Sequence, residues 1–408
     1  MTIIHDGETF DATASAYGVE ASPWSYILCR TRTGARMAKL EPLDPGSWQR
    51  RLGYKGTGAH SFSVAQSATR ERHHEAVNQV RIWQQMRPGE VTLIVSYQGQ
   101  PVYAGLVWKA TYSRASQRID ITHEDVWSLW ERRLAIPQHL YSAQTPVIRT
   151  VQDYPNLDLT THAKRVVQMG MIGPRTGLPG YQVPIALPAD QSGSYRMVHW
   201  TYDFATVADR LMEITEMDSG PHIDFEVEWA GDGGFRWRLD THTTRTESMI
   251  LHYSAAETPV TDIEYVRDLS EYYTEVHVTG EGSETGTLHR RRWLSEGSLG
   301  EHRVALGRHD SMGHLKTGPM VQEVTDGLLR ERIRATEQIQ CAVRVGGETG
   351  ISPHDLRLGM TIVLRGTDDP VIPRGDLERT LIGFSPKGTD QLTLELAPPP
   401  VSVSTVTD

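Results

Sequence analysis

The chain has 408 residues, and its 51 acidic and 41 basic residues give a formal net charge of −10. This balance excludes a general nucleic-acid-binding surface, because such a surface needs clustered positive charge to release counterions from phosphate. The length predicts roughly two to four domains, and the ordinary apolar and charged fractions supply enough material for their cores.

Residues 1–24 predict an N-terminal arm or a loosely paired first strand. They contain His5, Asp6 and Glu8 but lack the basic start and apolar core of a signal peptide. No stretch of the sequence approaches the ~20 apolar residues that a membrane-spanning helix needs. We therefore expect a soluble protein with no signal sequence and no membrane span.

The next region predicts strands followed by one short helix. Residues 25–31 are expected to form a strand, 44–47 a turn, and 60–64 a second strand whose side chains alternate between two faces. Apolar residues that share one face predict a short helix at about 70–85.

A three-strand meander is predicted at 91–97, 102–108 and 118–123. The first of these strands has few strongly polar residues on either alternating face, so we expect it to be buried on both faces. Thr122 followed by Asp125 resembles a capping box and predicts the start of a helix. The apolar stripe of that helix consists of Val126, Trp127, Trp130 and Leu134, and Pro137 ends the helix.

Residues 137–200 are rich in proline and glycine, which predicts an irregular, loop-rich segment. A helix is expected to open at Asp203, because apolar residues follow at helical spacing. Strands at 222–229 and 235–240 flank a glycine-rich turn and predict a hairpin. Together these elements predict a small α+β module.

The last third of the chain predicts a strand at 272–279 and then a polar stretch at 281–318. Pro319 is placed to sit in the first turn of a helix that runs to about 337. A strand follows at 339–345.

A second meander is predicted at 360–365, 379–384 and 391–396, about 270 residues after the first. In each copy one glycine precedes the first strand and another lies within or at the end of the second: Gly89 and Gly105, then Gly359 and Gly383. A protein with two similar β units is often a scaffold that meets a symmetric partner twice.

The common catalytic signatures are missing, since the sequence contains no GxSxG or HExxH motif and no phosphate-binding loop. Residues 313–318 fail the phosphate-loop pattern because Lys316 is misplaced, and 53–58 predict a glycine-rich turn rather than a dinucleotide loop. We expect no enzymatic activity and no cofactor, and we assign no catalytic, cofactor-binding or metal-binding residue.

Two polar clusters have residue types that occur in functional sites. His73, His74 and Glu75 offer metal ligands, but adjacent side chains on a helix point about 100° apart, so a solvated helix is favoured. Asp224 and Glu226 lie two apart on a strand and could pair as acid and base. Apolar residues alternate with them, so an exposed polar face is the simpler interpretation.

Other notable residues favour structural roles. The run from Arg290 to Arg292 predicts a solvated face or a source of interface ion pairs. Trp127 and Trp130 are expected in a core or an interface, and Cys29 and Cys341 as buried thiols rather than disulfide partners. Ten tryptophans and fifteen tyrosines favour an assembly component, because both residue types are enriched at interfaces.

Three segments resemble minor tail proteins of phages that infect actinobacteria. Residues 25–64 are similar to the N-terminal domain of that family, with a Leu-Glu-Pro step, Trp48 to Leu52 and a Phe-Ser-Val strand. Residues 87–105 carry its proline-glycine, strand, Gly-Gln-Pro-Val-Tyr-Ala-Gly stretch. A third likeness, to the second barrel of siphophage tail hubs, is carried by residues 273–280, the helix expected at 320–337 and the strand that starts at Leu358 and Gly359. The resemblance covers most of 25–397.

This resemblance implies a homotrimeric tail-tip hub, similar in fold to the baseplate hub of contractile-tailed phages. Each subunit would carry two tube-like β-barrels, so three chains present six similar units to a hexameric ring above and a trimeric spike or fibre below. The implied partners are the distal tail protein ring, the tape measure protein, the central fibre or spike and other minor tail proteins, with DNA only in transit. The implied location is the virion tail tip, assembled in the host cytoplasm. Since no long C-terminal extension is present, a separate partner is expected to make host contact.

The fold class expected from these elements is mainly β with α+β insertions, with two tube-like β-barrel domains that flank a middle α+β region. The expected division is an N-terminal arm at 1–24, a first hub barrel at 25–136, a loop-rich α+β middle domain at 137–260, a second hub barrel at 261–397 and a C-terminal tail at 398–408.

Two other functions stay open beside a structural hub that frames the DNA exit of a long non-contractile tail. A hexameric distal tail protein is the first, although a hexamer needs only one barrel per chain. A tail-associated protein that binds or degrades the cell wall is the second, and as an enzyme it would need paired carboxylates across a cleft or a zinc site.

Overall fold

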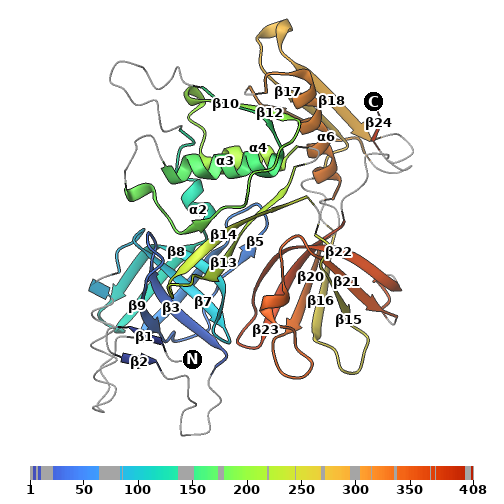
Figure 1. The fold of residues 1–408 in the computed structure, drawn as a ribbon. Helices are drawn as coiled ribbons and strands as arrows, with labels where there is room; N and C mark the ends of the chain where they lie inside the picture. Colours follow the sequence, from blue (N-terminus) through green and yellow to red (C-terminus); the bar gives the residue numbers. More distant parts are fainter. Residues whose placement is uncertain are drawn as a thin grey trace.

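The computed structural model describes residues 3–5, 8–10, 22–63, 83–84, 86–136, 151–172, 179–217, 220–243, 245–267, 272–294, 304–313, 315–334, 338–367, 369–372, 374–399 and 406–407. Strands dominate, so the expected mainly β class is confirmed. Two large sheets lie side by side, and helices and a smaller sheet lie above them in the view of Figure 1. None of the described helices is long and apolar enough to cross a membrane.

The first large sheet has the order β4-β3-β7-β8-β9-β6, and all of its neighbouring strands are antiparallel. Every residue of its β7 strand is buried, which confirms the prediction of burial on both faces. The strands of this sheet are β3 (Trp24–Arg30), β4 (Arg36–Leu40), β6 (Thr57–Ser63), β7 (Val91–Tyr97), β8 (Gln100–Ser113) and β9 (Arg118–Glu124).

The second large sheet has the order β15-β21-β22-β23-β20-β16, and a short strand, β5, pairs with β22. Only the β15–β21 pair among these is parallel. Its strands are β5 (Arg50–Arg51), β15 (Ser248–His252), β16 (Val260–Val266), β20 (Gln338–Arg344), β21 (Thr361–Gly366), β22 (Gly375–Pro386) and β23 (Gln391–Ala397).

The two predicted meanders are therefore present, as β7-β8-β9 and β21-β22-β23. Each starts at a glycine in the left-handed region, Gly89 with φ 81° and Gly359 with φ 85°. The amide of Gly89 donates to the Val107 carbonyl at 2.7 Å, and that of Gly359 donates to the Leu381 carbonyl at 2.8 Å. Each meander also pairs its third strand with an antiparallel strand, β6 or β20.

The surroundings of the two meanders differ. β3 runs antiparallel to β7, whereas β15 runs parallel to β21. Among the described residues, pairing between the named strands closes neither sheet into a complete barrel. In the first sheet, two isolated bridges, Pro42–Phe62 and Ser47–Ala59, join the segment after β4 to β6 and bring the two edges together. The second sheet is open between β15 and β16.

The middle of the chain combines helices with small sheets. β10 pairs with β12, and β11, β14 and β13 form a three-stranded sheet in that order. The elements are α2 (Trp127–Trp130), β10 (Val151–Leu157), α3 (Leu159–Ile172), β11 (Ile185–Ala186), β12 (Tyr195–Trp200), α4 (Val207–Thr215), β13 (His222–Trp229) and β14 (Phe235–His242).

Three predictions for this region need correction. The irregular segment expected at 137–200 holds α3, whose N-terminus is capped by Asp158, with its Oδ1 2.8 Å from the Thr161 amide. The helix expected to start at Thr122 begins later, because Thr122 continues β9 and Asp125 accepts from the Trp127 amide at 3.0 Å. The helix expected to open at 203 begins after Thr206, which forms a capping box with Asp209.

A four-stranded sheet and a long helix form the remaining unit, with strand order β19-β17-β18-β24. β18 and β19 lie within 281–318, where no element was predicted. Valines of β17 pack in the same core as the apolar face of α6. The elements are β17 (Glu275–Thr279), β18 (His289–Leu294), β19 (Gly307–Ser311), α6 (Gly318–Arg334) and β24 (Val406–Thr407).

The remaining elements are short. The N-terminal arm contains a small hairpin of β1 (Ile3–His5) and β2 (Glu8–Phe10). Short 3₁₀ turns lie at 179–181, 201–203, 284–286 and 353–355. The helix predicted at 70–85 lies outside the described residues except for the helical pair Trp83 and Gln84.

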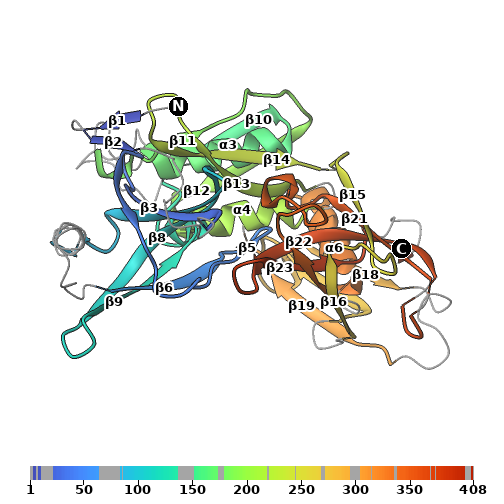
Figure 2. The ribbon, with the colours of Figure 1, turned by 90° about the horizontal axis from the view of Figure 1, so that it is seen from below.

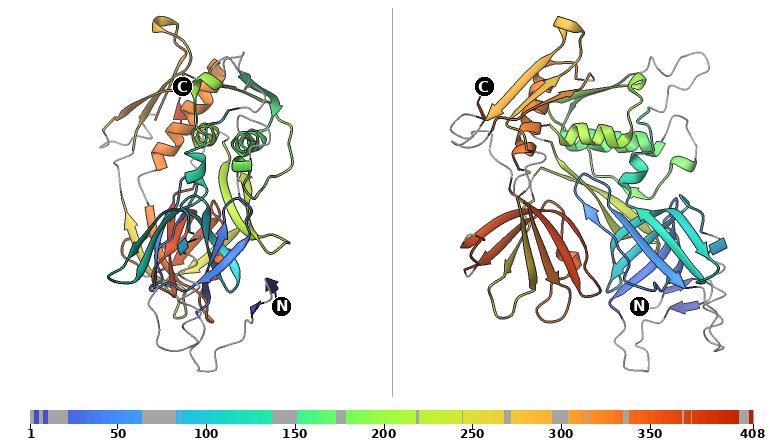
Figure 3. Two further views of the ribbon diagram at one scale, coloured as in Figure 1. Left: turned by 90° about the vertical axis from the view of Figure 1, so that its left-hand side faces the viewer. Right: turned by 180° about the vertical axis from the view of Figure 1, so that it is seen from behind.

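The apolar residues form two cores. One joins the interiors of the two large sheets, and the other joins the outer face of the first sheet to α3, α4 and α6. Figure 2 shows β5 between the sheets when the molecule is seen from below. The four-stranded sheet of β17, β18, β19 and β24 is called the small sheet below. In Figure 3 the helices and this small sheet lie on the side of the large sheets away from the N-terminus. The region where these parts meet is the junction described next.

Candidate functional site

The junction between the two large sheets is built by residues 48–52. Trp48 is 2% exposed, and its ring lies 5.6 Å from that of Tyr103 in the first sheet and 5.8 Å from that of Phe384 in the second. The Leu52 amide donates to the Ile382 carbonyl at 2.8 Å. A segment that lies between two strands of the first sheet in the sequence, β4 and β6, thereby extends the second sheet.

Polar contacts support the same crossing. Gln49 Nε2 donates to Glu395 Oε1 at 2.6 Å, and Arg51 pairs with Glu395 at 3.3 Å. A Cβ on Gly383 would lie 3.1 Å from the Arg50 carbonyl oxygen and 3.0 Å from a Glu395 carboxylate oxygen. Glycine at position 383 therefore allows β5 to approach β22 closely.

The second glycine of the first meander, Gly105, has a different role. A Cβ on Gly105 would lie 2.5 Å from Nδ1 of His123 and 2.6 Å from the Tyr103 hydroxyl. This glycine makes room for a buried histidine inside the first sheet. The two glycines lie at different places in their meanders, because Gly105 comes two residues before Val107 whereas Gly383 comes two residues after Leu381, the residue that matches Val107. The second glycine of the sequence pattern is therefore not a structural repeat.

Arg50 connects the junction to the middle of the chain. Its guanidinium lies 2.5 Å from the Asp224 carboxylate on β13, and the two side chains are only 11% and 6% exposed. Asp125 lies beside them and accepts from the amides of Gly56 at 2.7 Å and Trp127 at 3.0 Å. Burial raises the pKa of Asp125 well above its usual value, and the neighbouring Asp224 adds to this.

These side chains enclose very little space. The cavity that Arg50, Asp125 and Asp224 help to line has a volume of about 20 Å³. That volume is about the size of one water molecule, so the cavity has no room for an organic substrate.

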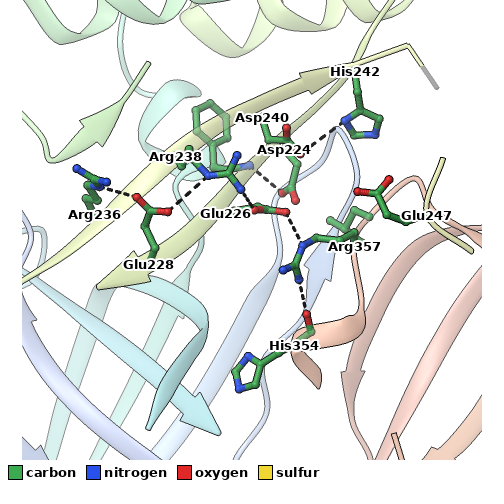
Figure 4. A network of polar contacts seen from close by, with 12 residues as sticks. Asp224, Glu226, Glu228, Arg236, Arg238, Asp240, His242, Glu247, His354 and Arg357 are labelled. Carbon is green, nitrogen blue, oxygen red and sulfur yellow. Dashed lines mark hydrogen bonds and ion pairs between the residues drawn. The ribbon is translucent and has the colours of Figure 1, made fainter. Parts of the chain in front are cut away.

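A second group of charges lies on β13 and β14, next to the second large sheet (Figure 4). Glu226 pairs with Arg238 and with Arg357 at 3.2 Å. Arg245 Nε donates to the Leu358 carbonyl at 2.7 Å, and His354 Nε2 lies 2.9 Å from the Tyr97 carbonyl oxygen. The network therefore touches the hairpin, the loop before β21 and the first sheet.

The prediction of an exposed polar face at Asp224 and Glu226 is wrong, because these residues are only 4% and 8% exposed. The polar face of β13 is covered by Arg50 on one side and by Arg357 on the other. Each carboxylate is paired with a guanidinium, and a buried carboxylate without its partner would be strongly destabilising. The arrangement fits a fixed connection between modules better than acid–base catalysis.

The other residues singled out in the sequence have structural surroundings. Trp127 and Trp130 are core residues, 3% and 0% exposed, as expected. Arg292 pairs with Asp326 of α6 at 2.5 Å, an ion pair within the chain that leaves the predicted interface role a prediction. No group of three or more metal-ligating side chains occurs within the described ranges, and residues 73–75 lie outside them.

The two cysteines are free and buried, also as expected. Burial raises the pKa of both Cys29 and Cys341 to about 12, so neither is a reactive thiolate.

Comparison with solved structures links this arrangement to known proteins. A tail protein from Neisseria meningitidis MC58 matches with a TM-score of 0.54 and 13% identity, over 92% of this chain and 96% of that one. The 43 kDa tail protein of prophage MuSo2 from Shewanella oneidensis matches with a TM-score of 0.52 and 10% identity, over 91% and 98%. The chain has the fold of these tail proteins.

The tail-protein fold covers both large sheets, the junction and the small sheet, since the matches span nearly the whole chain. A chain of the Francisella PdpA-VgrG complex matches at a TM-score of 0.50 and 8% identity, over 92% of this chain and 57% of that one. No protein-family model matches the sequence, and no curated protein matches it as a relative.

Proposed function

We propose that this chain is a non-enzymatic structural protein of a phage tail, and that three copies form a hub at the tail tip. The support is its likeness in fold to prophage and other tail proteins along nearly its whole length. The ion-paired carboxylates of the junction, and a cavity of about 20 Å³ beside them, offer no site for a reaction.

The observation that carries the trimer is the repeated meander. Gly89 and Gly359 hold the same backbone conformation and donate equivalent hydrogen bonds, to Val107 and to Leu381. Three chains would therefore present six similar sheets in a ring. Such a ring can face a hexameric neighbour with six units and a trimeric neighbour with three.

The junction supports this proposal by fixing the two sheets to each other. A pseudo-six-fold ring requires that both sheets of one chain keep a constant relative position. Trp48 fills the shared core, and β5 adds backbone pairing between the sheets. Two flexibly linked sheets would not reproduce the spacing of a ring.

The partners of such a hub would be the distal tail protein ring, the tape measure protein, a central spike or fibre and other minor tail proteins. DNA would pass through only in transit, in a virion with a long non-contractile tail. The expected division into an arm, two hub domains, a middle domain and a tail is part of this proposal.

The mass of the purified full-length chain in solution tests the proposal. A trimer has a mass of about 137 kDa, three times the 45.7 kDa of one chain. Light scattering on a size-exclusion column at several concentrations should give this value as the limiting mass. A limiting mass of six chains would favour a hexameric ring protein, and a strict monomer at all concentrations would contradict the hub.

A further inference from the structure

The outer face of the small sheet carries three histidines on neighbouring strands. β17 is central and contributes His277, β18 contributes His289, and β19 contributes His309. Alternate residues of β17, Val276 and Val278, are fully buried in the core shared with α6. Because side chains alternate along a strand, the histidines lie on the face away from that core.

Two of these histidines are in direct contact. His277 Nδ1 lies 3.1 Å from His289 Nε2, and the rings stack with centroids 5.3 Å apart and planes 19° from parallel. The other ring nitrogen of His277, Nε2, lies 2.6 Å from Glu275 Oε1. A carboxylate only accepts hydrogen bonds, so Nε2 of His277 carries the proton and, in the neutral ring, Nδ1 presents its lone pair toward His289.

The charged neighbours on this face are few. Glu275 also pairs with Arg291, whose guanidinium stacks over the Trp293 ring at 4.6 Å. The Glu275 carboxylate thus contacts both Arg291 and His277. Arg291 is thus held by Glu275 and by an aromatic ring.

We propose that His277 and His289 form a binding site for a divalent transition metal of the zinc, nickel or copper type. Imidazole is a preferred ligand of these ions. Zinc–nitrogen bonds of about 2.0–2.1 Å place two ligands of a tetrahedral ion about 3.3 Å apart. The observed separation of 3.1 Å is close to this value, so small ring movements suffice to admit the ion.

Glu275 strengthens the assignment. A metal-bound histidine usually donates its other N–H to a carboxylate, which orients the ring and raises its basicity. Glu275 and His277 already have this relation. Within the described residues no third ligand converges on the pair, so water would complete the coordination. The bound ion would fasten β18 to β17.

His309 serves as a matched control. It lies on the same face, directly across from His277 in the β17–β19 pair. Its Nε2 lies 3.0 Å from the Thr279 hydroxyl instead of facing another histidine. His309→Ala therefore removes an imidazole from the same surface and leaves the proposed site intact.

The experiment is a calorimetric titration of the full-length protein with zinc chloride at pH 7.5 in a non-coordinating buffer. We expect one zinc ion whose affinity falls more than about tenfold in His277→Ala and in His289→Ala, and about 10-fold to 100-fold in Glu275→Gln. His309→Ala should change the affinity less than about twofold. Circular dichroism confirms that each variant folds.

Three results would overturn the assignment. The first is the absence of zinc binding by the unaltered chain. The second is an affinity that His277→Ala and His289→Ala leave unchanged, since the chain has 17 histidines and background binding is expected elsewhere. The third is a loss of affinity in His309→Ala that equals the loss in His277→Ala.

Discussion

A buried histidine pair inside the first large sheet predicts acid sensitivity. His60 and His123 are 2% and 1% exposed, and His60 Nδ1 lies 2.9 Å from His123 Nε2. The Tyr103 hydroxyl lies 3.0 Å from Nδ1 of His123. Gly46 and Gly58 lack the Cβ atoms that would collide with the two imidazole rings. The interior of the sheet is thus shaped around two neutral rings.

Burial lowers the pKa of His60 from 6.5 to about 4, although Asp44 partly opposes the shift. Burial also lowers the pKa of His123 well below 6.5, and His60 adds to this. A histidine that binds its proton less tightly when folded costs no stability above pH 6.5. It destabilises the fold progressively as pH falls from 6.5 toward its folded pKa.

The magnitude follows from the shift. At pH 5 the unfolded chain is already 1.5 pH units below its histidine pKa of 6.5, while folded His60 is still neutral. Each unit is worth about 1.4 kcal/mol, so His60 lowers the free energy of unfolding by about 2 kcal/mol between pH 7.5 and pH 5. His123 acts in the same direction.

Urea unfolding of the full chain at pH 7.5 and pH 5, followed by tryptophan fluorescence, measures this effect. His60→Gln should remove about 2 kcal/mol of the difference between the two pH values. Burial raises the pKa of Glu213 to about 7, so this residue stabilises the fold as the pH falls. The unaltered protein and the His60→Gln variant both contain Glu213, so its contribution cancels when the two are compared. His252→Gln, at an exposed histidine of β15, is the matched control and should leave the difference unchanged.

The reasoning is refuted if His60→Gln and the unaltered protein lose the same free energy between the two pH values. It is also refuted if nuclear magnetic resonance shows the folded His60 ring titrating near pH 6.5.

Three further predictions concern the junction and the start of the second meander. Trp48→Ala should lower the free energy of unfolding in urea by about 3–5 kcal/mol. In calorimetry, the two sheets of this variant should unfold in separate transitions. A single unchanged transition would contradict the shared core. Arg50→Met should lower the free energy of unfolding by about 3–5 kcal/mol, because it leaves Asp224 buried without its partner. Adding Asp224→Asn should recover part of that loss in the double variant. If the losses in the two single variants simply add in the double variant, the ion pair is contradicted. Gly359→Ala should lower the melting temperature, because a residue with a side chain is strained at φ 85°. Gly231→Ala is the control and should leave the melting temperature unchanged, because the space around Gly231 is open. Equal changes in the two variants would contradict this prediction.

The meanders were predictable because their signals are local. Alternating apolar residues, a glycine before the first strand and turn residues between strands all lie within about 35 residues of one another. The buried character of β7 was likewise visible in its few charged positions. Local patterns of this kind predict strands and turns without any knowledge of distant partners.

The junction could not be predicted in the same way. Arg50 and Asp224 are 174 residues apart, and Gln49 and Glu395 are 346 residues apart. Asp224 alternates with apolar residues, a pattern that usually places a carboxylate in solvent. Only tertiary packing buries it, because β13 lies between the first sheet and the loop before β21.

The missed helix α3 has a different cause. Proline and glycine before and after it predicted an irregular segment, yet Leu159, Ala163, Val166 and Val167 follow helical spacing and Asp158 provides the cap. The proline and glycine residues around α3 thus hide an apolar period that is present in the sequence.

Averaged end-on images of the purified particle test the central claim most directly, because that claim concerns the symmetry made by two similar sheets in each of three chains. The account predicts a ring with three-fold symmetry whose rim shows six similar lobes, two from each chain. A ring of three lobes, or one in which six chains contribute one lobe each, would contradict it.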